Sequence, residues 1–211
     1  MMTEIVFILY PDFTQLDFAS PYEVFCRLPG ARVRIASPDG GDLRTEHGLT
    51  FRGVERLSDI DRCDLLCIPG GLDQSRITQP DALDDIRRLA AGATYVTSVC
   101  NGSLVLGAAG LLHGKRSACH WAMRDRLAEH GAIPDPARIV RDGNVITGGG
   151  VTAGIDFALV CAAAIAGDVA AQLIQLTIEY APEPPFHAGR PETAPPEVMA
   201  AFARLAGGSA A

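Results

Sequence analysis

The sequence predicts a single α/β domain in which helices cover both faces of a mostly parallel sheet. Apolar runs with the period of strands alternate along the chain with segments of helical periodicity. Glycine and proline residues separate these segments, and 211 residues, of which 48% are hydrophobic, suffice for one sizeable core. Because ligands of such sheets bind beyond the carboxyl ends of the strands, residues that follow a strand are the first candidates for function.

In the first half of the chain, each expected element is a periodic run that turn residues interrupt. The first strand, 4–10 (EIVFILY), ends at Pro11-Asp12, and a helix over 16–28 ends at Pro29-Gly30. The other strands are short apolar or alternating runs, expected at 32–37, 42–45, 49–54 and 64–68. A second helix is expected over 81–91.

The second half continues the alternation and then changes in composition. Strands are expected at 94–99, at 115–119 and as two short pieces within 138–147. Helices are expected at 103–112, 121–131, 152–166, 168–180 and 196–206, with Thr152 as an N-terminal cap. Prolines make 182–195 an extended arm. We therefore expect an α/β domain over 1–181 and a proline-rich arm with a terminal helix over 182–211 that packs on the same domain.

Composition excludes several classes of function. The net charge is −7 and no Lys/Arg cluster is present, so nucleic-acid binding is not expected. The sequence has neither an apolar run of the ~18 residues that a membrane helix needs nor a signal peptide, so a cytoplasmic protein is expected. Its 6 cysteines are scattered, which favours neither a disulfide framework nor a zinc site. No metal or organic cofactor is expected.

The segment TSVCNG, 97–102, carries the strongest local signal for chemistry. A strand runs into Cys100, an Asn-Gly pair turns the chain, and small residues begin a helix, which is the order of a nucleophile elbow. Such a turn holds the cysteine above the carboxyl end of the strand, and the amides of the next helix favour its thiolate. The alternative is a buried structural cysteine, a common state of a free thiol.

Two other strand ends offer partners for Cys100. The turn Gly70-Gly71 exposes backbone N–H groups which, with the N–H of Asn101, can stabilise negative charge on a reacting atom; otherwise it is only a tight turn. Asp17 follows the first strand, where a carboxyl beside a thiol titrates high and can donate a proton. The alternative for Asp17 is a solvated acid at a helix N-terminus.

Two further segments lie at expected strand ends. His120 precedes Trp121 and either lines the pocket, as in a Cys–His pair, or simply packs. No acid at positions 121 or 122 orients its imidazole. The glycines at 148–150 match neither a dinucleotide-binding nor a phosphate-binding spacing, so they predict close backbone packing beside the site.

Taken together, these motifs resemble the ThiJ/PfpI branch of the class I glutamine amidotransferase-like superfamily. The matching pieces cover nearly the whole chain and are YPDFTQLDFASPYEVF, IPGG, SVCNGSLVLGAAGLL, the HW pair, TGGGVTAGID and PPFHAGRP. Within that branch the chain is most similar to isonitrile hydratases and to the sensor-like domains of AraC-type regulators. The resemblance implies a flavodoxin-like fold and a homodimer.

For isonitrile hydratases the resemblance implies hydration of an isonitrile to an N-substituted formamide. Carried over to this chain, Cys100 is the nucleophile that forms a thioimidate, and Asp17 is the general acid/base. Asn101 departs from the family, in which threonine typically follows the nucleophile. Proteases and glyoxalase-like members carry histidine there, and amidotransferases carry His-x-Glu where this chain has His120-Trp121-Ala122, so neither reaction is expected.

The second hypothesis is a binding module without turnover, which senses a small molecule or an oxidant through the elbow thiol. AraC-type relatives append a helix-turn-helix domain. The segment after residue 181 has no room for one, which favours an enzyme.

Overall fold

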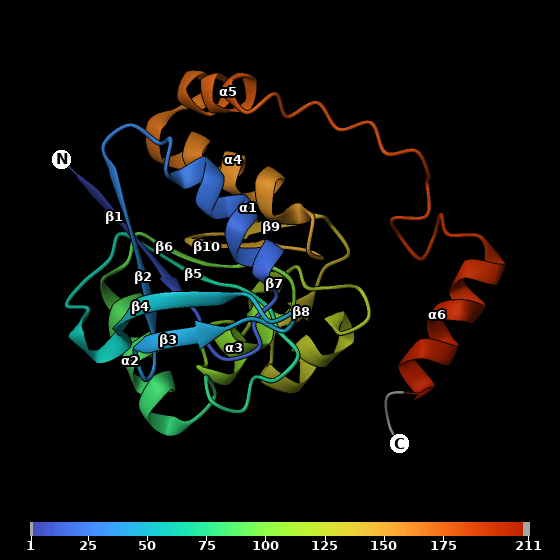
Figure 1. Ribbon diagram of the computed structural model, residues 1–211, viewed down its shortest axis with the longest axis horizontal. Helices are drawn as coiled ribbons and strands as arrows, with labels where there is room; N and C mark the ends of the chain where they lie inside the picture. The colour runs from blue at the N-terminus through green and yellow to red at the C-terminus, as the bar shows by residue number, and fades with distance from the viewer. Residues whose placement is uncertain (1, 209–211) are drawn as a thin grey trace. The chain divides into compact units, whose positions relative to one another are not determined.

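The computed structural model describes residues 2–208 and divides the chain into two compact units, with the boundary in the sequence between Ile178 and Glu179. The first unit is an α/β domain. Its main sheet has 8 strands in the order β3-β4-β2-β1-β5-β6-β10-β9 (Figure 1). The expected α/β class is therefore confirmed, with a sheet that is mixed and mostly parallel.

The parallel centre of the sheet consists of β1 (Thr3–Ile8), β2 (Ala31–Ser37), β5 (Leu65–Ile68), β6 (Tyr95–Ser98) and β10 (Val145–Gly148). β4 (Thr50–Arg56) continues it in parallel, while β3 (Gly41–Arg44) and β9 (Ile139–Asp142) close the two edges in antiparallel pairs. In the parallel centre every strand after β1 follows a crossover, so all these carboxyl ends point to the same edge.

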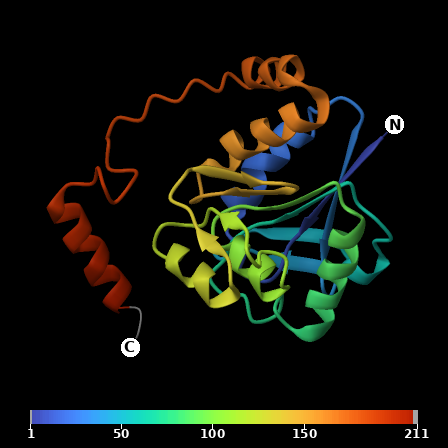
Figure 2. The same cartoon turned by 180° about the vertical axis from the view of Figure 1, so that it is seen from behind.

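Helices form a layer on each side of this sheet. The helices of the first unit are α1 (Gln15–Phe25), α2 (Pro80–Gly92), α3 (Gly102–Ala108), α4 (Ala153–Ala166) and α5 (Asp168–Thr177), with a short 3₁₀ turn, η1 (Leu57–Asp59). α1 and α4 lie over one face of the sheet, and α2 and α3 lie over the other (Figures 1 and 2). This arrangement is the covering on both faces that the alternating sequence predicts.

The core holds α1 firmly against the sheet. Phe7 of β1 is fully buried, and its ring contacts Phe18 of α1 edge-on at 5.0 Å between centroids. On the other side of α1, Gly154 of α4 approaches so closely that a Cβ there would lie 2.0 Å from Oγ of Ser20. Because α1 is packed on both sides, the residues of its first turn have little freedom to move.

Three local expectations are wrong. The strand expected at 115–119 is the short β7 (Arg116–Ser117), which pairs with β8 (Ile133–Pro134) outside the main sheet. It ends at Ser117 because the N–H of the next residue, Ala118, donates to the side-chain Oγ1 of Thr147 (2.8 Å) and not to a neighbouring strand. The helix expected at 121–131 is a 3₁₀ helix, η2 (Arg124–His130). Thr152 makes no side-chain capping bond; its backbone oxygen accepts a bond from Arg138 (2.8 Å).

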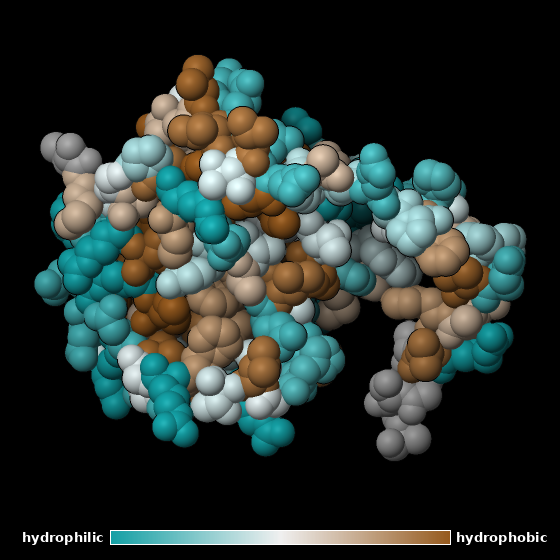
Figure 3. Space-filling model, turned by 45° about the horizontal axis from the view of Figure 1, so that its top comes forward, coloured by the Kyte–Doolittle hydropathy of each residue, from teal (hydrophilic) through white to brown (hydrophobic). Residues whose placement is uncertain are grey.

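The second unit contains an extended arm and then α6 (Pro196–Gly208), as the prolines predict. Its packing on the α/β domain stays a prediction. Within residues 2–208, no helix has the length and apolar character that a membrane span requires. One apolar surface is conspicuous on α5, where Val169, Leu173 and Leu176 are 82%, 60% and 78% exposed (Figure 3).

Candidate active site

The loops that follow β1, β5, β6 and β10 converge at one edge of the sheet. The N–H of Gly70, after β5, donates to Oδ2 of Asp17 in α1 (3.0 Å). The N–H of Cys100, after β6, donates to the carbonyl of Gly149, after β10 (2.8 Å). The structure thus brings together the predicted site residues from four strand ends.

Cys100 occupies a strained turn. Its φ of 59° lies in the left-handed region, which costs a residue with a side chain about 1–3 kcal/mol. The neighbouring bonds hold it there: its N–H is shared between the carbonyls of Gly148 (3.1 Å) and Gly149 (2.8 Å). Gly102 completes the turn, since a Cβ at this position would lie 2.3 Å from the carbonyl oxygen of Ile68. The geometry is that of the predicted nucleophile elbow.

Asp17 is fully buried beside this turn. Burial raises the pKa of its carboxyl to about 7, although hydrogen bonding with the Cys100 thiol and the Gly70 amide lowers the pKa in part. The second oxygen, Oδ1, forms no hydrogen bond of good geometry within residues 2–208. We therefore assign the Cys100 contact as a weak thiol interaction, which leaves Oδ1 free to exchange a proton. The alternative of a solvated helix-end acid does not hold.

The Cys100 side chain is also removed from water, with 6% of the residue exposed. Burial raises the pKa of its thiol, and so does the negative charge of Asp17; the N–H of Asn101 opposes both. The expected stabilisation of a thiolate by the following helix is therefore outweighed, and the resting form is a neutral thiol. The negative charge of Asp17 opposes ionisation of Cys100, so the two groups are not both charged near neutral pH.

Asn101 ties the elbow to the turn after β5. Its Nδ2 donates to the carbonyl of Gly71 (3.0 Å), and its Oδ1 accepts from the N–H of the same residue (2.9 Å). This reciprocal pair explains how asparagine fits directly after the nucleophile: the amide nitrogen is used as a donor and the amide oxygen as an acceptor, both toward the same residue.

The expected role of Gly70 and Gly71 as free oxyanion donors needs correction. Both amides are engaged, the first by Asp17 and the second by Asn101. A Cβ at Gly70 would lie 2.2 Å from Oδ1 of Asn101 and 2.7 Å from Oδ2 of Asp17, so the absence of a side chain is what lets the three residues meet. The turn positions the acid and the amide, and the N–H of Asn101 is the donor that faces the sulfur.

His120 lies at the margin of this site. Burial lowers the pKa of its imidazole, so the ring is neutral near pH 7, and its Nδ1 accepts from the N–H of Ala122 (3.3 Å). It packs beside the turn after β10, where a Cβ on Gly150 would lie 3.0 Å from Cδ2 of the ring. Its hydrogen bond with Ala122 and its ring contact with Trp121, at 5.8 Å between centroids, are both with neighbours in sequence, which supports packing over a Cys–His pair.

Three residues of the site escaped the sequence analysis. Tyr10 is fully buried and donates its hydroxyl to the carbonyl of Pro69 (3.0 Å). Gln74 donates to the carbonyl of Asn101 (2.8 Å), and the charge of Glu46 contributes to the raised pKa of Asp17. Tyr10 reads as the end of an apolar strand, and the other two lie in loops without periodicity. Only the YPDF motif at the end of the first strand could have drawn attention to Tyr10.

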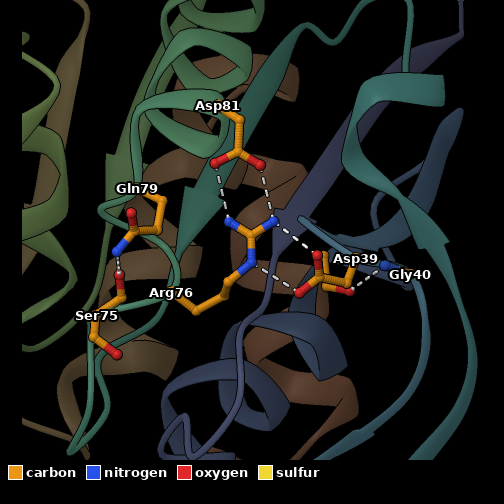
Figure 4. A network of polar contacts seen from close by, with 7 residues as sticks. Asp39, Gly40, Ser75, Arg76, Gln79 and Asp81 are labelled. Carbon is orange, nitrogen blue, oxygen red and sulfur yellow. Dashed lines mark hydrogen bonds and ion pairs between the residues drawn. The ribbon is translucent and has the colours of Figure 1, made fainter.

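The loop that carries Gln74 is anchored by Arg76. The guanidinium binds both oxygens of Asp39, after β2, at 2.8 and 2.7 Å, and both oxygens of Asp81 at 3.2 and 2.9 Å (Figure 4). These bonds lower the pKa of both carboxyls. Through these two ion pairs, Arg76 joins the loop to the edge of the sheet and to the start of α2.

No group of three or more histidine, cysteine or acidic side chains within residues 2–208 is arranged to hold a metal ion.

The fold and this site define a class of α/β proteins that present a cysteine on a strained elbow with a carboxyl at its side. The DJ-1/PfpI family matches residues 3–164, and the chain belongs to this family.

Comparison with individual proteins finds members of this family, and proteins that share its domain, that are similar to this chain. The chain is 48% identical to isonitrile hydratase from Pseudomonas putida over 200 residues, which is 94% of this chain and 88% of that protein. It superimposes with a TM-score of 0.93 and 39% identity on a ThiJ/PfpI family protein from Pseudomonas syringae, covering 97% of this chain and 86% of the other. It is 30% identical to the HTH-type transcriptional regulator CdhR from Pseudomonas aeruginosa over 75% of this chain and 49% of that protein.

Proposed function

We propose that the protein is an isonitrile hydratase, which converts R–N≡C and water into R–NH–CHO. The observation that carries this proposal is the buried pair of Cys100 and Asp17, in a chain 48% identical to the Pseudomonas putida enzyme. Hydration of an isonitrile requires a nucleophile for the terminal carbon and a proton for that same carbon. The pair supplies both from adjacent atoms.

In the first half of the reaction the pair holds one proton. Asp17 accepts the proton of the Cys100 thiol as the sulfur attacks the terminal carbon, and delivers it to that carbon. The product is a thioimidate, R–N=CH–S–Cys100, and Asp17 is left as a carboxylate. A carboxyl with a pKa of about 7 suits this step, because it can take up and release a proton near neutral pH.

In the second half the Asp17 carboxylate accepts a proton from water as the oxygen adds to the thioimidate carbon, and it passes this proton to the nitrogen. The resulting R–NH–CH(OH)–S–Cys100 collapses to the formamide: the C=O bond forms as the C–S bond breaks, and Asp17 transfers the hydroxyl proton to the departing sulfur. The N–H of Asn101 is directed at this sulfur and stabilises its negative charge as the C–S bond breaks. The free Oδ1 of Asp17 is the atom proposed to exchange protons, while Oδ2 stays bonded to Gly70.

A direct assay tests the proposal. The protein is incubated with a simple alkyl isonitrile, and the N-substituted formamide is measured by chromatography and mass spectrometry. We expect formamide from the wild-type protein and none above background from Cys100→Ala. A wild-type protein that forms no formamide from alkyl or aryl isonitriles would contradict the proposal.

The similarity to CdhR supports one alternative, a domain that binds a small molecule without turning it over. The same experiment separates the two candidates. Saturable binding of the isonitrile to Cys100→Ala and to wild type, with no formamide from either, favours the binding module.

A further inference from the structure

We propose that Glu46 is a positioning residue for Asp17: through Thr14 it holds the turn that hydrogen-bonds the Asp17 carboxyl, and it places a second carboxylate beside that turn. The inference rests on the proposed role of Asp17 in proton transfer. It assigns a second carboxylate to the site, from the loop between β3 and β4.

Glu46 is an acid in an enclosed position. Its side chain is only 9% exposed, which is unusual for a carboxylate in a loop. Oε2 accepts a hydrogen bond from Oγ1 of Thr14 (3.0 Å), and the backbone N–H of Glu46 donates to the carbonyl of Phe13 (3.3 Å). The only basic side chain within ion-pair distance of it in residues 2–208 is His47, whose Nε2 lies 3.4 Å from Oε1 and whose side chain is 71% exposed.

A continuous set of hydrogen bonds leads from Glu46 to Asp17. Thr14, which Glu46 binds by its side chain, donates its backbone N–H to the carbonyl of Gly70 (2.8 Å). The N–H of Gly70 then donates to Oδ2 of Asp17 (3.0 Å), and the N–H of Asp17 returns to the carbonyl of Thr14 (3.0 Å). Glu46 therefore fixes one member of a closed ring of contacts that determines where the Asp17 carboxyl lies.

The charges around Asp17 act in one direction. The titratable groups that face it are Cys100 from the elbow, Tyr10 from the end of β1, Cys67 from β5 and Glu46. None of them carries a positive charge, and the charge of Glu46 raises the pKa of Asp17. Buried like charges repel more strongly than exposed ones, so an enclosed carboxylate at this point keeps the proton on Asp17 to higher pH.

Proton affinity at Asp17 serves both halves of the proposed reaction. A carboxylate that binds a proton more tightly draws it more readily from the Cys100 thiol, and later from water. Loss of the Glu46 charge leaves a weaker base. The acid limb of the pH profile, below which both members of the pair are protonated, then moves to lower pH.

The test is a titration of Asp17 that needs no isonitrile. Asp17 is followed by carbon NMR in protein labelled at the aspartate carboxyl carbons, and Asp17→Asn identifies its signal. Glu46→Gln keeps an oxygen for Thr14 but removes the charge. We expect the midpoint of Asp17 to fall by roughly a few tenths of a pH unit or more, with a parallel fall in the acid limb of kcat/KM.

Two further variants serve as a control and as an independent test. Glu23→Gln removes a carboxylate from the same helix as Asp17 at a position 58% exposed, and we expect no shift. His47→Lys places a permanent positive charge beside Glu46 without touching the packed residues, and we expect a smaller shift in the same direction as Glu46→Gln. If Glu46→Gln does not fold, this surface variant decides the question.

The outcomes separate this inference from the proposed function. The role of Glu46 is overturned if the titration midpoint of Asp17 is the same in Glu46→Gln as in wild type, even if formamide is produced. If Glu46→Gln does not fold, an unchanged midpoint in His47→Lys overturns it in the same way. A midpoint that falls while no isonitrile is hydrated supports the role of Glu46 and contradicts the proposed reaction.

Discussion

Replacing Asp17 by asparagine should change the pH dependence of folding as well as the rate of catalysis. Burial raises the pKa of this carboxyl from its usual 3.8 to about 7, a difference of about 3 pH units. At about 1.4 kcal/mol for each unit, this difference corresponds to about 4 kcal/mol. The folded protein binds more protons at Asp17 than the unfolded chain does between these two values. The contribution of Asp17 to the free energy of unfolding therefore falls as the pH rises from 4 to 7, and it is constant above pH 7.

Asp17→Asn removes this dependence while keeping the size of the side chain and an oxygen for the N–H of Gly70. The difference in the free energy of unfolding, variant minus wild type, should therefore increase by about 4 kcal/mol between pH 4 and pH 8. Turnover of an isonitrile should fall by about 10²-fold or more, because the amide cannot accept the thiol proton.

Urea unfolding at several pH values, together with steady-state formamide formation, measures both effects. Asp84→Asn is the matched control: it removes an aspartate from α2 whose side chain is 74% exposed, and its curve should run parallel to wild type. The reasoning would be refuted if Asp17→Asn also ran parallel to wild type, or if it retained near-wild-type turnover.

Three other predictions concern the elbow and the C-terminal unit. In a Cys26→Ser background, which removes the one exposed cysteine, iodoacetamide at neutral pH should label Cys100 before the other buried cysteines, because Asp17 can accept its proton as the sulfur reacts; peptide mass spectrometry that finds Cys100 inert would contradict its role as nucleophile. Asn101→Thr breaks the reciprocal bonds to Gly71 and should lower the free energy of unfolding by about 1 kcal/mol, while isonitrile hydration is kept or raised; hydration by this variant but not by wild type would point to a different natural substrate. The protein should be a homodimer, and truncation after Tyr180 should lower its melting temperature or its activity; a monomeric, fully active product in light scattering and assay would oppose both expectations.

Much of the fold was predictable because its signals are short-range. The runs at 4–10, 32–37 and 64–68 lie within one or two residues of β1, β2 and β5. The helix at 121–131 was mispredicted because periodicity does not separate an α-helix from a 3₁₀ helix. The strand at 115–119 was overextended because Thr147, distant in sequence, takes the N–H of Ala118.

The sequence could predict which residues form the site, but not their protonation or their hydrogen-bond partners. A strand that ends in Cys-Asn-Gly points to a nucleophile elbow, and an acid after the first strand of a parallel sheet points to the same edge. The protonation of Cys100 and the engagement of the Gly70 amide could not be read from those patterns. Both depend on burial and on a partner, Asp17, which is 53 positions away from Gly70.

The sequence by itself determined the order of elements, the turn that bears Cys100 and the glycines that allow close approach, since these follow from local periodicity and backbone sterics. The tertiary structure alone decided that Asp17 holds its proton to about pH 7, that Asn101 closes the turn at Gly71, and that Glu46 reaches the site. Desolvation and hydrogen-bond partners arise only when distant segments pack together, and they set the free energy of each charge.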